Sequence, residues 1–156
     1  MSERFELQRT IPADPATIFA VVSSPSGHVA IDATGMLQGY TGEAATAVGD
    51  TFVIHMDRES LGDLPMGKYD VTVTITAYEQ DAFITWEVSG PGFPSIGHYY
   101  GYRLEPVEGG TLVTSIYDWS GVDEQWNRGD GTWPIISELA LKATLGILHR
   151  TVAPSS

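Results

Sequence analysis

Apolar and polar residues alternate along several stretches of this chain, which is the pattern of strands with one buried face. The clearest stretch is residues 69–77, where Tyr, Val, Val, Ile and Ala alternate with Asp and Thr and β-branched residues dominate. The same alternation predicts further strands at residues 4–11, 51–59, 83–89, 98–104 and 111–119. Turn-forming residues separate neighbouring stretches in the second half of the chain, so we predict two β-hairpins there.

Helical patterns flank the predicted strands. Asp14 stands directly before Pro15, and this pair suits an N-cap followed by the first turn of a short helix. Residues 23–27 then break that helix, and residues 28–40 predict one more helical turn and an irregular strand. Near the C-terminus, residues 134–152 have apolar side chains at spacings of three and four, which predicts a helix about 28 Å long.

The long predicted helix has a broad apolar face that needs a large apolar partner. Its stripe consists of Ile136, Leu139, Ala140, Ala143 and Ile147. Consecutive strands that are each apolar on one face supply such a partner. We therefore predict an α+β fold, in which a curved antiparallel sheet of about six or seven strands wraps around the C-terminal helix and two short helices follow the first strand. At 156 residues we expect one domain over residues 1–156.

Composition narrows the range of partners. Twenty acidic residues against eight basic ones give a net charge of -12, which repels phosphate backbones and anionic lipid, so we expect no nucleic-acid partner. The first residues lack a basic segment followed by an apolar run, and no stretch reaches the roughly 18 apolar residues of a membrane span. We therefore expect a cytoplasmic protein without a membrane span.

Metal and cofactor motifs are missing from the sequence. There is no cysteine, and the four histidines are scattered without HxH or HExxH spacing. Neither GxGxxG nor a phosphate-binding P-loop occurs, and residues 92–97 have one residue too many for a GxSxG nucleophile elbow. We therefore expect no metal and no cofactor.

Short motifs spread over nearly the whole chain resemble one superfamily. Residues 11–19 (IPADPATIF) resemble its passage from the first strand into a helix, and residues 48–52 (VGDTF) its turn into the third strand. Residues 79–86 (EQDAFITW) resemble its hairpin that ends in tryptophan, and residues 102–114 (YRLEPVEGGTLVT) the hairpin that follows. Together with the element order, these motifs resemble the START-like (SRPBCC) superfamily, which includes birch pollen allergen-like proteins and polyketide cyclases. The resemblance implies a helix-grip fold with an apolar cavity between the sheet and the long helix.

Strand alternation and the helix stripe predict which residues line such a cavity. The expected lining is Ile54, Met56, Tyr69, Val71, Val73, Trp86, Val88, His98, Tyr100, Tyr102, Tyr117, Trp119, Ile136, Leu139 and Ala143. Aromatic walls with a few hydroxyls and one imidazole suit a flat or hydrophobic ligand. We therefore expect the chain to bind a hydrophobic small molecule, such as a lipid, polyketide or aromatic metabolite. The alternative is that these side chains simply fill the core.

His98 is the best candidate for a catalytic residue. A cyclase needs a base that removes a carbon-bound proton and a donor that stabilises the enolate. His98 with Tyr100, Tyr102 or Tyr117 is the grouping in phase on one face that offers both. A polyketide cyclase or aromatase-like enzyme is therefore the alternative to binding, although a histidine on an apolar face is more often a core residue. The resemblance also leaves open a protein-interaction module like the co-chaperone branch of the superfamily.

Other histidines and two tryptophans are predicted to lie outside the cavity or at its edge. His55 lies on the opposite phase from the cavity face, so we expect it outside the cavity unless the register slips by one residue. His28 and Asp32, four residues apart, predict a surface pair near the cavity entrance. Trp126 and Trp133 precede the long helix and either cap the cavity or take part in a homodimer contact.

Overall fold

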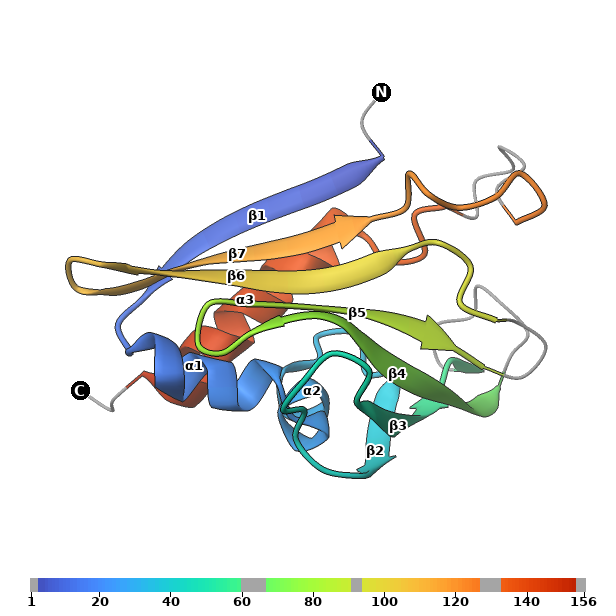
Figure 1. The fold of residues 1–156 in the computed structure, drawn as a ribbon, viewed down its shortest axis with the longest axis horizontal. Helices are drawn as coiled ribbons and strands as arrows, with labels where there is room; N and C mark the ends of the chain where they lie inside the picture. The colour runs from blue at the N-terminus through green and yellow to red at the C-terminus, as the bar shows by residue number, and fades with distance from the viewer. Residues whose placement is uncertain (1–2, 60–66, 91–93, 127–132, 154–156) are drawn as a thin grey trace.

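The computed structural model describes residues 3–59, 67–90, 94–126 and 133–153. In this part of the chain a seven-stranded antiparallel sheet packs with three helices (Figure 1). The strands are β1 (Arg4–Ile11), β2 (Leu37–Thr41), β3 (Thr51–Asp57), β4 (Lys68–Glu79), β5 (Phe83–Ser89), β6 (Tyr99–Val107) and β7 (Gly110–Asp118). Their spatial order is β1-β7-β6-β5-β4-β3-β2, with every neighbouring pair antiparallel. The predicted α+β class is confirmed.

The strand register places the apolar side chains of neighbouring strands on one face of the sheet. Ile54 of β3 pairs with Val71 of β4, and Val73 of β4 pairs with Val88 of β5. Ile54, Val71 and Val73 are all buried. Apolar pairs of this kind stabilise a sheet through packing on the shared face. The alternation of apolar and polar residues in the sequence therefore corresponds to one buried face and one more exposed face of the sheet.

Two short helices follow β1, as predicted, namely α1 (Pro15–Val22) and α2 (Pro25–Ile31). The Asp14 carboxylate accepts the N–H of Thr17 at 2.8 Å and caps α1. Residues 23–27 do more than break this helix, because Ser24 accepts the N–H of Gly27 at 3.0 Å and so caps α2. The second helix therefore starts three residues before the predicted helical turn at residue 28.

The C-terminal helix α3 (Glu138–Val152) is shorter than predicted and is rotated relative to the predicted face. It begins at residue 138 instead of 134, because the Ser137 hydroxyl caps it by accepting the N–H of Ala140 at 3.1 Å. Its buried side chains are Leu141, Leu145 and Leu148. These leucines form a second apolar stripe along the same helix, and it is this stripe that packs into the interior of the protein.

Helix α3 lies across one face of the sheet, behind β6 and β7 in the view of Figure 1. Helices α1 and α2 lie at the end of the sheet near the C-terminus of α3, and both contact α3. One core cluster joins these helices to the centre of the sheet, and a second joins β7 to the start of α3. Within the described residues, no helix is long and apolar enough to cross a membrane.

Candidate functional site

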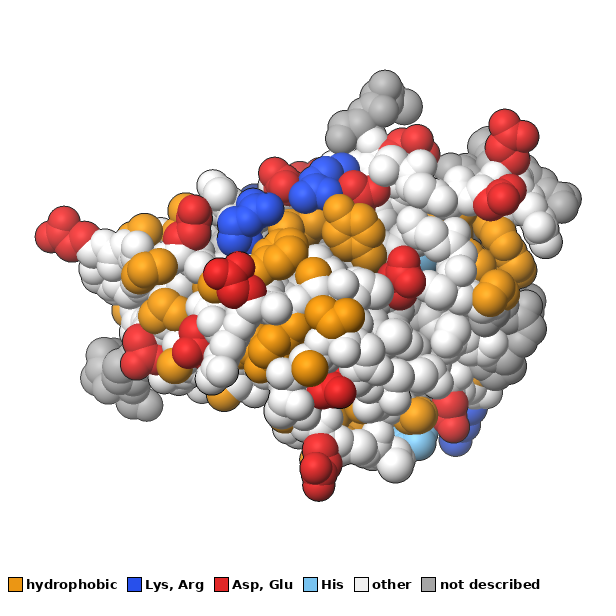
Figure 2. Space-filling model, in the orientation of Figure 1, with side chains coloured by type: hydrophobic (Ala, Val, Ile, Leu, Met, Phe, Trp, Pro, Cys, Tyr) orange, Lys and Arg blue, Asp and Glu red, His pale blue; other side chains and the backbone are white. Residues whose placement is uncertain are grey.

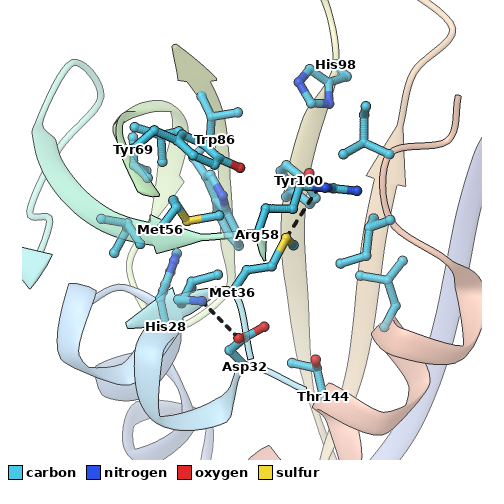
Figure 3. Close-up of a pocket in the computed structure, with 18 of the residues that line it drawn as sticks. His28, Asp32, Met36, Met56, Arg58, Tyr69, Trp86, His98, Tyr100 and Thr144 are labelled. Carbon is cyan, nitrogen blue, oxygen red and sulfur yellow. Dashed lines mark hydrogen bonds between the residues drawn. The ribbon is translucent and has the colours of Figure 1, made fainter. Parts of the chain in front are cut away.

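A pocket of about 350 Å³ lies between the sheet and the helices (Figure 3). Strands β3 to β6 form one wall, and α2, α3 and the segments next to them form the other. Most residues of the predicted lining border this pocket, namely Ile54, Met56, Tyr69, Val71, Val73, Trp86, Val88, His98, Tyr100, Tyr102 and Ile136. The structure therefore brings together side chains from four strands and from the segment before α3.

Four residues of the predicted lining lie elsewhere. Leu139 is 75% exposed and Ala143 is also exposed, so the expectation for both was wrong. The reason is the rotation of α3, which turns their face to the outside. Tyr117 and Trp119 are buried instead in the second core cluster, where they pack with Leu141. The predicted cavity lining therefore wrongly included Tyr117 at the end of β7 and Trp119 just after it, which belong to the core.

Trp126 and Trp133, predicted either to cap the cavity or to join a dimer contact, border the pocket, and so do His28 and Asp32. The lining residues that the sequence did not indicate are Ile31, Met36, Leu37, Arg58, Ile96, Ile135, Leu141 and Thr144. The expected surface pair of His28 and Asp32 was wrong for His28, which is only 8% exposed. The Ser24-Pro25 pair repeats the Asp14-Pro15 start signal, and it was the available sign of a helix there.

Aromatic rings form a continuous wall of the pocket. The ring of Trp86 is stacked with that of Tyr100, with centroids 5.9 Å apart, and lies 5.8 Å from the ring of Tyr102. The His28 ring lies 4.5 Å from Trp86 on one side, and the His98 ring lies 5.7 Å from Tyr100 on the other. These distances are typical of favourable ring contacts. Such a wall suits a flat apolar molecule.

His98 lies directly before β6 and is held by the phenol of Tyr117. Its Nδ1 is 2.9 Å from the Tyr117 oxygen, and the Tyr117 ring is stacked with that of Tyr100, with centroids 4.5 Å apart. Burial lowers the pKa of His98 to about 4. Burial also raises the pKa values of Tyr100 and Tyr117. At neutral pH this cluster is therefore uncharged.

His28, at the opposite end of the view in Figure 3, is also held by a single bond. Its Nε2 lies 2.7 Å from the carbonyl oxygen of Val22 in the last turn of α1. Burial lowers the pKa of His28 to about 4, so this ring is neutral at pH 7 as well. The two imidazoles therefore add polarity to the pocket without adding charge.

Two ionisable side chains complete the lining. Arg58 is 5% exposed, and its Nη1 donates to the Met36 sulfur at 3.3 Å (Figure 3). The Asp32 carboxylate accepts the N–H groups of Thr34 and Leu37 and so holds the turn between α2 and β2. Both side chains have a structural partner and also border the pocket.

Other candidate groups lie outside this pocket. His55 is on the outer side of the sheet, as expected, where its Nδ1 is 2.8 Å from Asp70 and its Nε2 is 3.0 Å from the Thr41 hydroxyl. A second pocket of about 460 Å³, lined by both polar and apolar side chains, lies between β1 and α3. In the ranges that the structure describes, no group of three or more His, Asp or Glu side chains could hold a metal ion.

The sheet, the C-terminal helix and the pocket between them define a helix-grip protein with an interior pocket. No family model and no curated protein matches the chain. Solved structures do match it over almost its whole length. A protein from Chromobacterium violaceum is 14% identical, with a TM-score of 0.68 over 97% of this chain and 99% of the other.

Two further structures give the same result. Major latex-like protein 151 from Panax ginseng is 17% identical, with a TM-score of 0.63 over 97% of both chains. The Aha1 dimer from Colwellia psychrerythraea is 18% identical, with a TM-score of 0.57 over 96% of this chain and 95% of the other. The chain therefore shares the fold of these proteins, which confirms the predicted helix-grip fold.

Proposed function

We propose that the chain binds a hydrophobic small molecule, such as a lipid, polyketide or aromatic metabolite, in the pocket between the sheet and α3. The observation that carries this proposal is the pocket itself, with about 350 Å³ of space beside an aromatic wall. Small-molecule sites have volumes of roughly 300–1,000 Å³ and mostly apolar walls with a few polar groups. Packing alone does not account for the space, because protein cores are filled to about the density of organic crystals.

A pocket-filling substitution tests this proposal. We expect the wild-type chain to bind the neutral fluorophore N-phenyl-1-naphthylamine, measured by the rise in its fluorescence. Val71→Trp replaces a small side chain of β4 with an indole ring that fills part of the pocket, and it should weaken binding by about tenfold or more. Val107→Trp, at a residue of β6 that is 40% exposed, is the matched control and should bind like the wild type. Absence of wild-type binding, or full binding by Val71→Trp, contradicts the proposal.

An enzyme of the polyketide cyclase or aromatase kind is the second candidate. The bond between His98 and Tyr117, with the Tyr100 ring stacked on that of Tyr117, is the observation in its favour. The lowered pKa of His98 argues for the binding role, because a base with a pKa of about 4 accepts a carbon-bound proton poorly. The test is deuterium exchange of the acidic methylene of 1-phenyl-1,3-butanedione, followed by NMR. Exchange accelerated by the wild type but not by His98→Gln would favour the enzyme.

The remaining predictions concern the whole chain. We propose one domain over residues 1–156 and a cytoplasmic location.

Trp126 and Trp133 were predicted either to cap the cavity or to form a homodimer contact, and we propose the homodimer as the alternative. Both tryptophans line the pocket, which supports the capping role over the dimer contact. The Aha1 neighbour, described as a dimer, supports the homodimer. A co-chaperone-like protein-interaction module is the third candidate function. Light scattering coupled to size-exclusion chromatography decides between monomer and dimer.

A further inference from the structure

His28 contributes a hydrogen-bond acceptor to the pocket. Its Nε2 is 2.7 Å from the Val22 carbonyl oxygen, and a carbonyl oxygen can only accept. Nε2 must therefore carry a hydrogen. Burial lowers the pKa of His28 to about 4, so the ring carries only one N–H at neutral pH. Nδ1 is consequently left with a lone pair and no hydrogen.

This lone pair has no partner among the described residues. Nε2 makes the side-chain hydrogen bond of His28, and every fully enclosed side-chain nitrogen or oxygen in the described ranges has a partner. Nδ1 is therefore not fully enclosed, and His28, only 8% exposed overall, borders the pocket. A ligand that covers Nδ1 without donating a hydrogen bond to it would leave this acceptor unpaired, which is unfavourable. Water or a ligand must supply that donor.

The surroundings of His28 favour an aromatic donor. The His28 ring lies 4.5 Å from the Trp86 ring, and Trp86 borders the pocket together with Tyr102. Asp32, at the C-cap of the same helix, also borders the pocket, and its carboxylate is a further acceptor. This side of the pocket therefore combines hydrogen-bond acceptors with flat ring surfaces.

We propose that His28 is a specificity-determining residue that selects aromatic ligands carrying an O–H or N–H donor, which bonds to its Nδ1. The proposal rests on the proposed binding function and names the ligand class, namely phenols and comparable aromatic donors. A ligand of the same shape with an ether in place of the hydroxyl leaves Nδ1 unpaired. Sites built around such a bond reject ligands that lack the donor.

A matched pair of ligands tests the proposal. 2-Naphthol and 2-methoxynaphthalene share one ring system, but only the first has a donor. We expect 2-naphthol to bind the wild type about tenfold more tightly, measured by displacement of N-phenyl-1-naphthylamine. Equal affinities would overturn the role of His28 and leave the binding function intact. Binding of neither ligand, and of no fluorophore, would overturn both proposals.

Substitution of His28 separates recognition from structure. His28→Phe keeps an aromatic ring and removes Nδ1, so the ratio of the two affinities should fall to about one. His28→Leu also lacks any acceptor, has a smaller side chain than phenylalanine, and serves if His28→Phe does not fold. His55→Phe, on the outer side of the sheet, is the matched control and should keep the wild-type ratio. A merely structural role would weaken both ligands equally, and an unchanged ratio in the His28 variants overturns the proposal.

Discussion

At the scale of single residues, burial decides the charge of the two pocket histidines. Both His28 and His98 have pKa values lowered to about 4, mainly by desolvation, whereas a histidine in an unfolded chain titrates near 6.5. Between these values the unfolded chain binds more protons than the folded chain. The free energy of unfolding must therefore rise with pH over this window and level off above it.

Replacing His98 should reduce this pH dependence. His98→Phe removes one of the two buried imidazoles and keeps an aromatic ring in its place. We expect urea denaturation between pH 4.5 and 6.5 to show a shallower rise of unfolding free energy in His98→Phe than in the wild type. The full slope is at most about 1.4 kcal/mol per pH unit for each histidine.

Three carboxyl groups with lowered pKa values affect stability mainly below this pH window. The pKa values of Asp14, Asp50 and Asp118 lie below 3.8 because each carboxylate accepts hydrogen bonds. Their contribution to stability is present above their unfolded pKa and is lost only as the pH falls through the folded one. A slope in His98→Phe equal to that of the wild type would contradict the neutral, buried state of His98.

At the scale of elements, the junction of α1 and α2 positions His28 against the pocket. The two helices approach so closely that a Cβ built on Gly27 would lie 1.8 Å from the Val21 carbonyl oxygen. No side chain fits there without moving the backbone of one helix. Glycine at this position is therefore a requirement of the helix junction and, through it, of the pocket.

A pair of glycine substitutions tests this junction. Gly27→Ala should lower the free energy of unfolding by about 1–3 kcal/mol, because one helix must shift to relieve the clash. Gly146→Ala, in the middle of α3, meets nothing closer than 3.7 Å and should raise it by about 0.5–1 kcal/mol. Thermal and urea unfolding measure both. Equal effects of the two substitutions would contradict the close approach of α1 and α2.

The sequence predicted a strand or helix correctly where its residue pattern fitted only one arrangement of that element. Strands such as β4 alternate strictly, and Asp14-Pro15 is a sufficient start signal for α1. Helix α3 was harder, because Leu139 and Ala143 form one apolar stripe and Leu141 and Leu145 form another. Both stripes have helical spacing, and only packing against the sheet chose the second.

At the scale of the whole molecule, acidic charge dominates the surface. The net charge is -12, and Figure 2 shows acidic side chains spread over the visible face with few basic ones between them. Like charges on a compact chain repel one another and lower its stability, and salt screens this repulsion. The acidity affects stability through the whole surface rather than through one site.

Salt should therefore stabilise the protein. We expect the midpoint of thermal unfolding at pH 7 to rise by a few degrees between 10 and 200 mM NaCl. An equal osmolality of a neutral solute is the control for effects other than screening. A midpoint that stays constant or falls with added NaCl would contradict net repulsion as a destabilising contribution.

The sequence by itself determined the α+β class, the order of the elements and the strand phase that points Ile54, Val71 and Trp86 at the pocket. These features depend on local periodicity, which a chain carries in its own residue order. Tertiary structure decided which stripe of α3 is buried and that His28 faces the pocket instead of solvent. Those outcomes depend on how the helices pack against the sheet, and packing joins residues far apart in the chain.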